Sequence, residues 1–201
     1  MARPRSSIRS DILVAARDAF ATGGFEGASI RTIARAARTS GAMVVYHFET
    51  KDGLFRAVVD DVYDGFLADL QAIAAAEPDP VERLRRLLTR MAAVTDNERV
   101  VFTIVAREAT SPSERLHYLL GRFLGGHGAL IADALASGAA TGALRAVPLP
   151  LSVPLVVAPI VVSNLVLHAL SSVGLGDVEG AGSHALDLVL RGLLPRPESG
   201  E

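Results

Sequence analysis

Apolar residues recur every three or four positions along most of the chain, which is the spacing of one buried face of a helix. The first such run covers residues 8–22 and ends at Gly23-Gly24. A second run continues from Leu54 to Ile73 and predicts one long helix that ends before Pro78. The same period recurs toward the C-terminus, so the pattern predicts an all-α protein of about nine helices.

Between the first two runs, residues 25–55 predict two short helices joined by a tight turn. Ser29 and Ser40 stand where a hydroxyl caps the start of each short helix, and Thr50 stands before the long one. Such short helices bury little surface alone, so the helices before and after them must complete a small core. This is the helix-turn-helix arrangement, in which the second short helix enters the DNA major groove. The residues expected to point inward are Ile30, Ile33, Ala34 and Ala37 in the first short helix, and Val44, Val45 and Phe48 in the second.

After the long helix, Asp79-Pro80 is a clear helix start signal, with a capping acid before a proline at the first helical position. Residues 100–106 are apolar nearly all round, which predicts a short helix in the centre of a larger domain. Ser111-Pro112 repeats the start signal and opens a helix that a cluster of glycines at residues 125–128 weakens. We expect a bend there, or the close approach of a neighbour or ligand.

Residues 138–150 are expected to form a loop, and the last two helices are expected over residues 151–172 and 180–194. Both are rich in aliphatic residues and need a partner surface to cover them. Residues 151–173 are apolar enough to raise the alternative of a membrane span. Pro154, Pro159 and several polar residues interrupt the stretch, so a buried helix that packs on a partner is the favoured interpretation.

Charge separates the N-terminal part from the rest. Residues 1–56 hold nine Arg or Lys against five Asp or Glu, whereas the whole chain has a net charge of -2. Phosphate binding is therefore expected in the N-terminal part. The basic arm of residues 1–7 is interpreted as a disordered tail, with a DNA contact by Arg3 or Arg5 as the alternative.

The chain has no cysteine, which excludes disulfides and thiolate metal sites. Its five histidines are too scattered for a helical zinc motif, and we find no catalytic or phosphate-loop motif. No enzymatic activity, cofactor or metal is therefore expected. The N-terminus lacks the apolar run of a secretory signal, which predicts a cytoplasmic protein.

The chain resembles the TetR family of transcriptional regulators, which are all-helical homodimers that bind operator DNA. The resemblance rests on ILVAARDAF at residues 12–20, GFEGASIRTIA at residues 24–34 and YHFETKDGLF at residues 46–55. It implies a DNA-binding domain over residues 1–50 and a ligand-binding and dimerisation domain over residues 51–201. Two positions depart from the family pattern. Arg38 replaces the usual turn glycine, which suggests a strained or slightly altered turn, and Val45 replaces the usual tyrosine, with Tyr46 one residue later.

The family pattern and the residue types together select the expected DNA contacts. Hydroxyl and ammonium groups suit phosphate, either in place of helix capping or together with it. The outward positions of the second short helix offer almost no bidentate hydrogen bonding, so base reading should depend on thymine methyl contacts, on Tyr46 and on arginines at its side, Arg31, Arg35 or Arg38. The predicted DNA-binding residues are Ser29, Arg31, Thr32, Ser40, Gly41, Ala42, Met43, Tyr46, His47 and Lys51.

The resemblance also implies a small-molecule pocket in the larger domain and a homodimer formed through the last two helices. A mainly apolar lining predicts a small, largely apolar effector. Ordinary core or dimer packing is the alternative for each residue, and Asn164 and His168 could hydrogen-bond across the dimer. The candidate lining residues are Phe66, Met91, Phe102, Tyr118 and Phe123, with Arg107, Asn164 and His168 as polar anchors.

The favoured function is a DNA-binding regulator, a repressor released from double-stranded operator DNA when its effector binds. Two alternatives remain from the residues alone: a helical scaffold whose basic head binds an acidic protein, and a helical enzyme that acts on small molecules. Salt-dependent binding to duplex DNA distinguishes the regulator from the scaffold.

Overall fold

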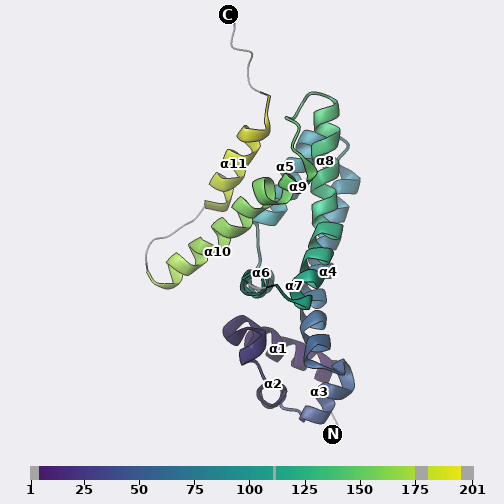
Figure 1. Cartoon of the computed structure of the whole chain (residues 1–201), viewed down its shortest axis with the longest axis vertical. Coiled ribbons are helices and arrows are strands. Elements are labelled where there is room, and N and C mark those ends of the chain that lie inside the picture. Colours follow the sequence, from purple (N-terminus) through teal and green to yellow (C-terminus); the bar gives the residue numbers. More distant parts are fainter. Residues whose placement is uncertain (1–4, 111, 175–180, 196–201) are drawn as a thin grey trace, which may run out of the picture. The chain divides into compact units, whose positions relative to one another are not determined.

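A computed structural model describes residues 5–110, 112–174 and 181–195 of the chain. Within these residues all regular structure is helical, in nine runs from α1 to α11, two of which contain a π-helical turn (Figure 1). The predicted all-α fold is confirmed. The predicted basic arm lies mostly outside the described residues, and α1 (Arg5–Gly27) already begins at its end.

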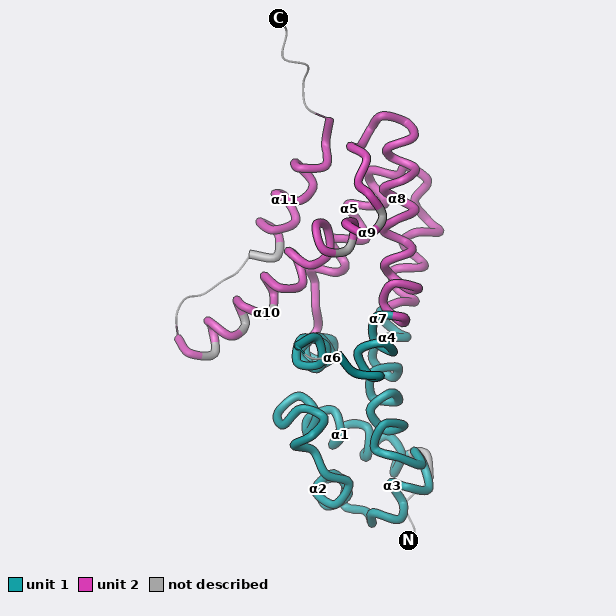
Figure 2. Tube along the Cα trace, in the orientation of Figure 1, with its two compact units in different colours: residues 1–66, 96–120 teal, residues 67–95, 121–201 magenta. Residues whose placement is uncertain are grey.

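The chain forms two compact units (Figure 2). The first, here called the head unit, combines Met1–Phe66 with Asp96–Leu120. The second unit combines Leu67–Thr95 with Gly121–Glu201. The boundary between the two compact units falls inside one continuous helix, α4 (Lys51–Ala76). It therefore differs from the predicted boundary between the DNA-binding and ligand-binding domains at residue 50. That boundary remains a prediction.

The core of the head unit is built around three phenylalanines. Phe20 and Phe25 of α1 stack with ring centroids 5.9 Å apart, and Phe55 of α4 meets both rings edge-on. The predicted faces of α2 (Ile30–Ala36) and α3 (Gly41–Phe48) supply the rest of this core through Ile33, Ala34, Val44 and Phe48. Gly24, with φ of 67°, breaks the regular path of α1 close to the predicted end of that helix.

Helix α6 (Asp96–Glu108) corrects one prediction. Its apolar character predicted a place in the centre of the larger domain, but the helix packs on α1 in the head unit. Val101 and Ile104 are buried there. Helix α7 (Glu114–Phe123) begins later than predicted, with Ser113 as its cap: the Leu116 N–H donates to Ser113 Oγ at 3.0 Å. Residue 111, the predicted cap, lies outside the described residues.

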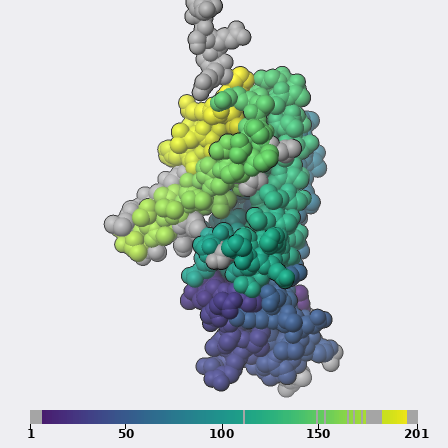
Figure 3. Space-filling view, in the orientation of Figure 1, coloured from purple at the N-terminus to yellow at the C-terminus, as the bar shows by residue number. Residues whose placement is uncertain are grey.

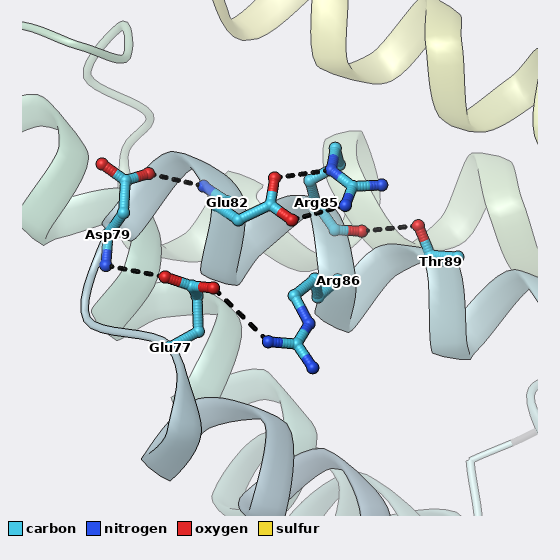
Figure 4. A network of polar contacts seen from close by, with 6 residues as sticks. All are labelled: Glu77, Asp79, Glu82, Arg85, Arg86 and Thr89. Atoms are coloured by element: carbon cyan, nitrogen blue, oxygen red, sulfur yellow. Dashed lines mark hydrogen bonds and ion pairs between the residues drawn. The ribbon is translucent and has the colours of Figure 1, made fainter.

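In the second unit, α5 (Pro80–Ala92) begins as predicted, with the Glu82 N–H donating to Asp79 Oδ1 at 2.8 Å. Polar contacts secure this start (Figure 4). Glu77 accepts from the Asp79 N–H at 3.2 Å and pairs with Arg86, and Glu82 pairs with Arg85. The opposite face of α5 is fully apolar and buries Leu84, Leu87, Leu88 and Met91.

The predicted glycine interruption is a π-helical turn, η1 (Leu124–Gly128), between α7 and α8 (Ala129–Ala140). Gly126 departs from helical geometry there, with ψ of -108°. The predicted loop over residues 138–150 is shorter than expected, because α8 continues to Ala140 and α9 (Leu149–Ser152) begins at Leu149. Gly138 is required in α8, since a Cβ atom would stand 2.5 Å from Leu144 Cδ1.

The C-terminal helices are α9, the π-helical turn η2 (Val153–Val157), α10 (Ala158–Ser172) and α11 (Ala181–Leu193). Helix α10 packs on α11 and α5, and Figure 3 shows α10 and α11 as adjoining green and yellow surfaces. The segment Pro150–Ser171 has the length and composition of a membrane span, with 20% of its most apolar window buried. Length and composition alone do not distinguish such a span from a helix that packs on a partner.

Candidate DNA-binding surface of the head unit

Exposed hydroxyls cap the first helix of the helix-turn-helix. Ser29 Oγ accepts from the Thr32 N–H at 3.1 Å, and Thr32 Oγ1 accepts from the Ser29 N–H at 3.3 Å. This reciprocal pair is the capping box that fixes the start of α2. Both side chains remain exposed, so their hydroxyl oxygens are available to a ligand as well.

The next two helices start in the same way. The Met43 N–H donates to Ser40 Oγ at 3.2 Å at the start of α3, and the Gly53 N–H donates to Thr50 Oγ1 at 2.9 Å at the start of α4. Ser40 and Thr50 are exposed. All three predicted caps of the helix-turn-helix are therefore confirmed, and each places a hydroxyl on the surface of the head unit.

The turn between α2 and α3 is strained as the sequence predicted. Arg38 has φ of 53°, in the left-handed region that favours glycine. The backbone tolerates this because the Thr39 N–H donates to the Ala34 carbonyl at 2.9 Å, which closes the turn. Glu49, at the end of α3, also has a positive φ of 64°.

The outward face of α3 differs from the predicted one at Val45. This residue was expected inside with Val44 and Phe48, but its side chain is 50% exposed. Val44 and Phe48 lie four apart on the face of α3 that packs on α1 and α2, and residue 45 is turned by about 100° from residue 44. Tyr46 is 65% exposed and Ala42 is exposed, whereas Gly41 and Met43 are half-buried. Val45 therefore joins Ala42 and Tyr46 as an outward apolar group.

His47 lies between two aromatic neighbours on α3. Its ring centroid is 5.2 Å from that of Tyr46 and 6.1 Å from that of Phe48. The Nε2 atom is buried and has no hydrogen-bond partner in the part of the chain that the structure describes. His47 as a whole is half-buried, and its phosphate contact stays a prediction.

Cationic groups flank the two helices of the motif. Arg31, Arg35 and Thr39 line a hollow of about 490 Å³ with Ile30, Ala34 and Gly41, and both arginines are exposed. At the start of α4, Lys51 Nζ lies 4.3 Å from the centroid of the Phe25 ring. The ammonium group therefore lies over this ring of the aromatic core, and Lys51 is half-buried.

The predicted effector residues do not gather in one described cavity. Phe66, Phe102, Arg107 and Tyr118 belong to the head unit, whereas Met91, Phe123 and Asn164 belong to the second. Phe66 and Phe102 meet edge-on, with ring centroids 6.0 Å apart. The Tyr118 hydroxyl donates to Asp60, and Arg107 is exposed beside Gly24. Core packing accounts for the phenylalanine pair, and the position of Arg107 gives no support to its role as an anchor.

In the second unit, Met91 is fully buried in the core and Phe123 contacts the His127 ring at 5.5 Å. The Asn164 side chain donates to the Ile160 carbonyl of its own helix at 3.0 Å. The side chain of His168 lies outside the described residues. A different hollow of about 470 Å³ is present in this unit, which the sequence did not indicate. It is lined by Arg145, Ala146, Val147, Pro148, Leu155, Val156, Pro159, Leu188, Val189, Gly192 and Leu193.

Among the described residues, no group of three or more His, Cys, Asp or Glu side chains stands close enough together to hold a metal ion. The buried histidine of the second unit is neutral at physiological pH, because burial lowers the pKa of the His127 imidazole to about 4. It lies in η1.

Residues 12–58 match the family model described as bacterial regulatory proteins of the tetR family. This segment runs from α1 to the first part of α4 and contains the whole helix-turn-helix.

Two curated proteins are similar to the chain. A probable HTH-type transcriptional regulator of Bacillus subtilis, YttP, is 28% identical over 120 residues, which are 59% of this chain and 58% of that protein. The HTH-type transcriptional repressor NicS of Pseudomonas putida is 32% identical over 80 residues, which are 40% of this chain and 38% of that protein. The alignments thus span about half the length of these relatives.

Solved structures share the fold over nearly the whole chain. A Clostridium perfringens protein described as a fatty acid metabolism regulator gives a TM-score of 0.79 at 20% identity, over 92% of this chain and 100% of that one. HlyIIR, a hemolysin II transcriptional regulator, gives a TM-score of 0.70 at 21% identity, over 96% and 100%. At these identities the likeness concerns the fold alone. The helical second unit therefore has the same kind of architecture as those proteins.

Proposed function

This chain belongs to the TetR family of helix-turn-helix transcriptional regulators, and from that premise we propose that it is a homodimeric repressor of double-stranded operator DNA. The observation that carries the proposal is the head unit itself. It presents three capped helix starts with exposed hydroxyls, and an exposed face of α3 flanked by arginines.

Phosphate contacts come from the capping hydroxyls and from the cations beside them. Ser29 and Thr32 serve at the start of α2, Ser40 at the start of α3, and Lys51 at the start of α4. A serine oxygen that accepts a backbone N–H can still donate its own proton to a phosphate oxygen, so capping and DNA contact are compatible. His47, next to Tyr46 on α3, contributes a further phosphate contact.

Base recognition depends on shape and on apolar contact. Ala42, Val45 and Tyr46 are exposed on α3, and Gly41 permits close approach of the backbone. Methyl groups of alanine and valine suit the thymine methyl in the major groove, whereas none of these three side chains forms a bidentate pair with a base. Arg31 and Arg35 reach the duplex from the side. Met43 is half-buried and takes a smaller part.

The dimer is proposed to form through α10 and α11. Val162, Val166 and Leu188 are large apolar side chains that are about half exposed or more in the single chain. Apolar surface of this extent on two neighbouring helices needs a cover, and a second copy of the same helices completes a four-helix arrangement. Two heads then meet half-sites about one helical turn, ~34 Å, apart on the duplex. Burial in this dimer interface would also explain why a cytoplasmic protein contains so apolar a segment as Pro150–Ser171.

Release by a small, largely apolar effector is the proposed control. NicS is named as a repressor, and this chain is proposed to act in the same sense. Met91 and Phe123 of the second unit remain proposed apolar contacts of this effector. Binding of a ligand to the DNA-free form alone shifts the population away from the operator.

Operator binding by matched variants tests the proposal. Purified protein is incubated at physiological salt with duplexes from the intergenic DNA beside its gene and with shuffled duplexes of equal composition. We expect preferential binding to one intergenic duplex, and a loss of about tenfold or more for Tyr46→Ala and Lys51→Ala. Arg85→Ala is the control, because Arg85 is an exposed residue of α5 in the second unit. Full retention by Tyr46→Ala and Lys51→Ala would refute the assigned surface.

A further inference from the structure

The guanidinium of Arg115 joins three helices of the head unit to α7. Its Nε donates to Glu108 Oε2 of α6 at 3.0 Å. Its two terminal nitrogens lie 3.6 Å from Glu26 of α1 and 3.6 Å from Asp52 of α4. Each nitrogen of the guanidinium thus faces a different carboxylate, in the fixed planar geometry that distinguishes arginine from the compact ammonium of lysine.

The face of the same guanidinium rests on an aromatic ring. Arg115 Cζ lies 3.7 Å from the centroid of Phe25, and Lys51 Nζ lies 4.3 Å from that centroid. Phe25 is buried and belongs to the phenylalanine core of the head. One ring therefore holds two cations by cation–π attraction, and one of them is the lysine assigned to phosphate at the start of α4.

The orientation of Arg115 is set from the α6–α7 side. Glu108 Oε2 accepts from Ser113 Oγ at 3.2 Å as well as from Arg115, and Ser113 also caps α7. The Arg115 side chain is only 19% exposed, and the Glu108 side chain 11%. A guanidinium so enclosed by carboxylates is not available to DNA phosphate itself, so any effect on DNA must pass through its neighbours.

We propose that Arg115 is a positioning residue for DNA binding, which holds Phe25 and the first turn of α4 so that Lys51 meets the phosphate backbone. This inference rests on the proposed function. It adds Arg115 to the residues that determine DNA binding, although Arg115 lies outside the helix-turn-helix and sixty-four positions after Lys51 in the sequence.

A double-mutant cycle tests the inference. Operator affinity is measured for wild type, Arg115→Ala, Lys51→Ala and the double variant, with helix content and thermal unfolding recorded for each. We expect Arg115→Ala to lose about tenfold in affinity while it stays folded, and the double variant to bind no more than about twofold more weakly than Lys51→Ala. A residue with only a structural role gives additive losses instead. Additive losses, or wild-type affinity in folded Arg115→Ala, would overturn the proposal.

Arg115→Lys keeps the inference testable if the alanine variant fails to fold. Lysine retains the charge but lacks the planar group that rests on the Phe25 ring, so we expect a loss of about threefold that again disappears in the Lys51→Ala background. Equal affinity of Arg115→Lys and wild type would count against the proposal. Failure of the wild type to prefer any operator is a separate result, which contradicts the proposed function and not the role of Arg115 alone.

Discussion

Arg38 shows how a single residue determines the turn of the helix-turn-helix. Its φ of 53° costs an ordinary side chain about 1 kcal/mol that glycine would not lose. We therefore predict that Arg38→Gly raises the free energy of unfolding by up to about 1 kcal/mol. Chemical denaturation of the two proteins measures the difference.

Arg35→Gly is the matched control for this prediction, since Arg35 is also exposed but lies inside α2. Glycine in a helix costs about 1 kcal/mol relative to a good helix former, so the control should lose stability. A loss of the same size at both positions would show that the turn is not strained.

At the scale of single residues, the sequence predicts chemistry better than orientation. The caps Ser29, Ser40 and Thr50 were predictable because capping depends on local spacing and on one hydroxyl. Val45 was not, because in a helix of eight residues two neighbouring valines fit the buried face almost equally well. Only the packing of α3 on α2 and α1 decides which of them points inward.

Two substitutions of Ser40 distinguish its role as the cap of α3 from its proposed role as a phosphate contact. Ser40→Ala removes the cap and should cost about 1 kcal/mol of stability as well as operator affinity. Ser40→Asp keeps a capping oxygen and places a negative charge at the helix start, so its stability should match that of wild type. The carboxylate repels phosphate, however, and operator binding should fall steeply.

Denaturation and gel-shift measurements on both variants check this prediction. Thr50→Asp provides a comparison at the next helix start, which has the same type of cap. If Ser40→Asp bound the operator as strongly as wild type, Ser40 would lie away from the phosphate backbone.

The π-helical turn η1 makes the second unit sensitive to acid. Burial lowers the pKa of the His127 imidazole from 6.5 to about 4 in the folded chain. Between these values the unfolded chain takes up a proton that the folded chain does not. The contribution of His127 to stability is therefore complete above about pH 6.5 and is lost as the pH falls toward 4. The loss is on the order of 3 kcal/mol at most.

Thermal unfolding at pH 7 and pH 5 tests the role of His127. We expect His127→Gln to show a smaller difference between the two pH values than wild type, and His117→Gln to behave as wild type because His117 is exposed. Equal pH sensitivity in His127→Gln and wild type would contradict the buried neutral state.

Elements were predictable where start signals were strong. The Asp79-Pro80 signal predicted the start of α5 correctly. The apolar period from Leu54 to Ile73, followed by Pro78, predicted the end of α4. The glycines of η1 predicted an interruption of the helix at residues 125–128. Periodicity alone does not distinguish a bend from a π-helical turn. Helix α8 continues to Ala140, past the start of the loop expected at residue 138, and Gly138 inside it leaves room for the Leu144 side chain.

At the scale of the whole molecule, tertiary partners were the least predictable feature. Helix α6 is apolar enough for the centre of any domain, and only the structure shows that it packs on α1. The network of Arg115 has the same origin, since it joins residues from four helices that no spacing in the sequence brings together. The effector residues remain a prediction for the same reason.

The proposed dimer makes a prediction at this scale. Leu188 of α11 is 73% exposed in the single chain, and burial against a second copy would remove most of that apolar surface from water. A charge there would be desolvated in the dimer, so Leu188→Glu should shift the protein to monomers and abolish tight operator binding. Sedimentation over a concentration series measures the shift.

Ser183→Glu is the control, because Ser183 is an exposed polar position on the same helix. A dimer of unchanged stability in Leu188→Glu would place the interface elsewhere.

The central claim is that the head unit binds a specific duplex largely through its phosphates. The most direct measurement is the affinity of the wild-type protein for a duplex selected from random sequence and for random duplex, each over a series of salt concentrations. The account predicts a linear loss of log affinity with log salt for both, and an excess of about a thousandfold or more for the selected site. Equal affinity for selected and random duplex, or binding that does not change with salt, would contradict it.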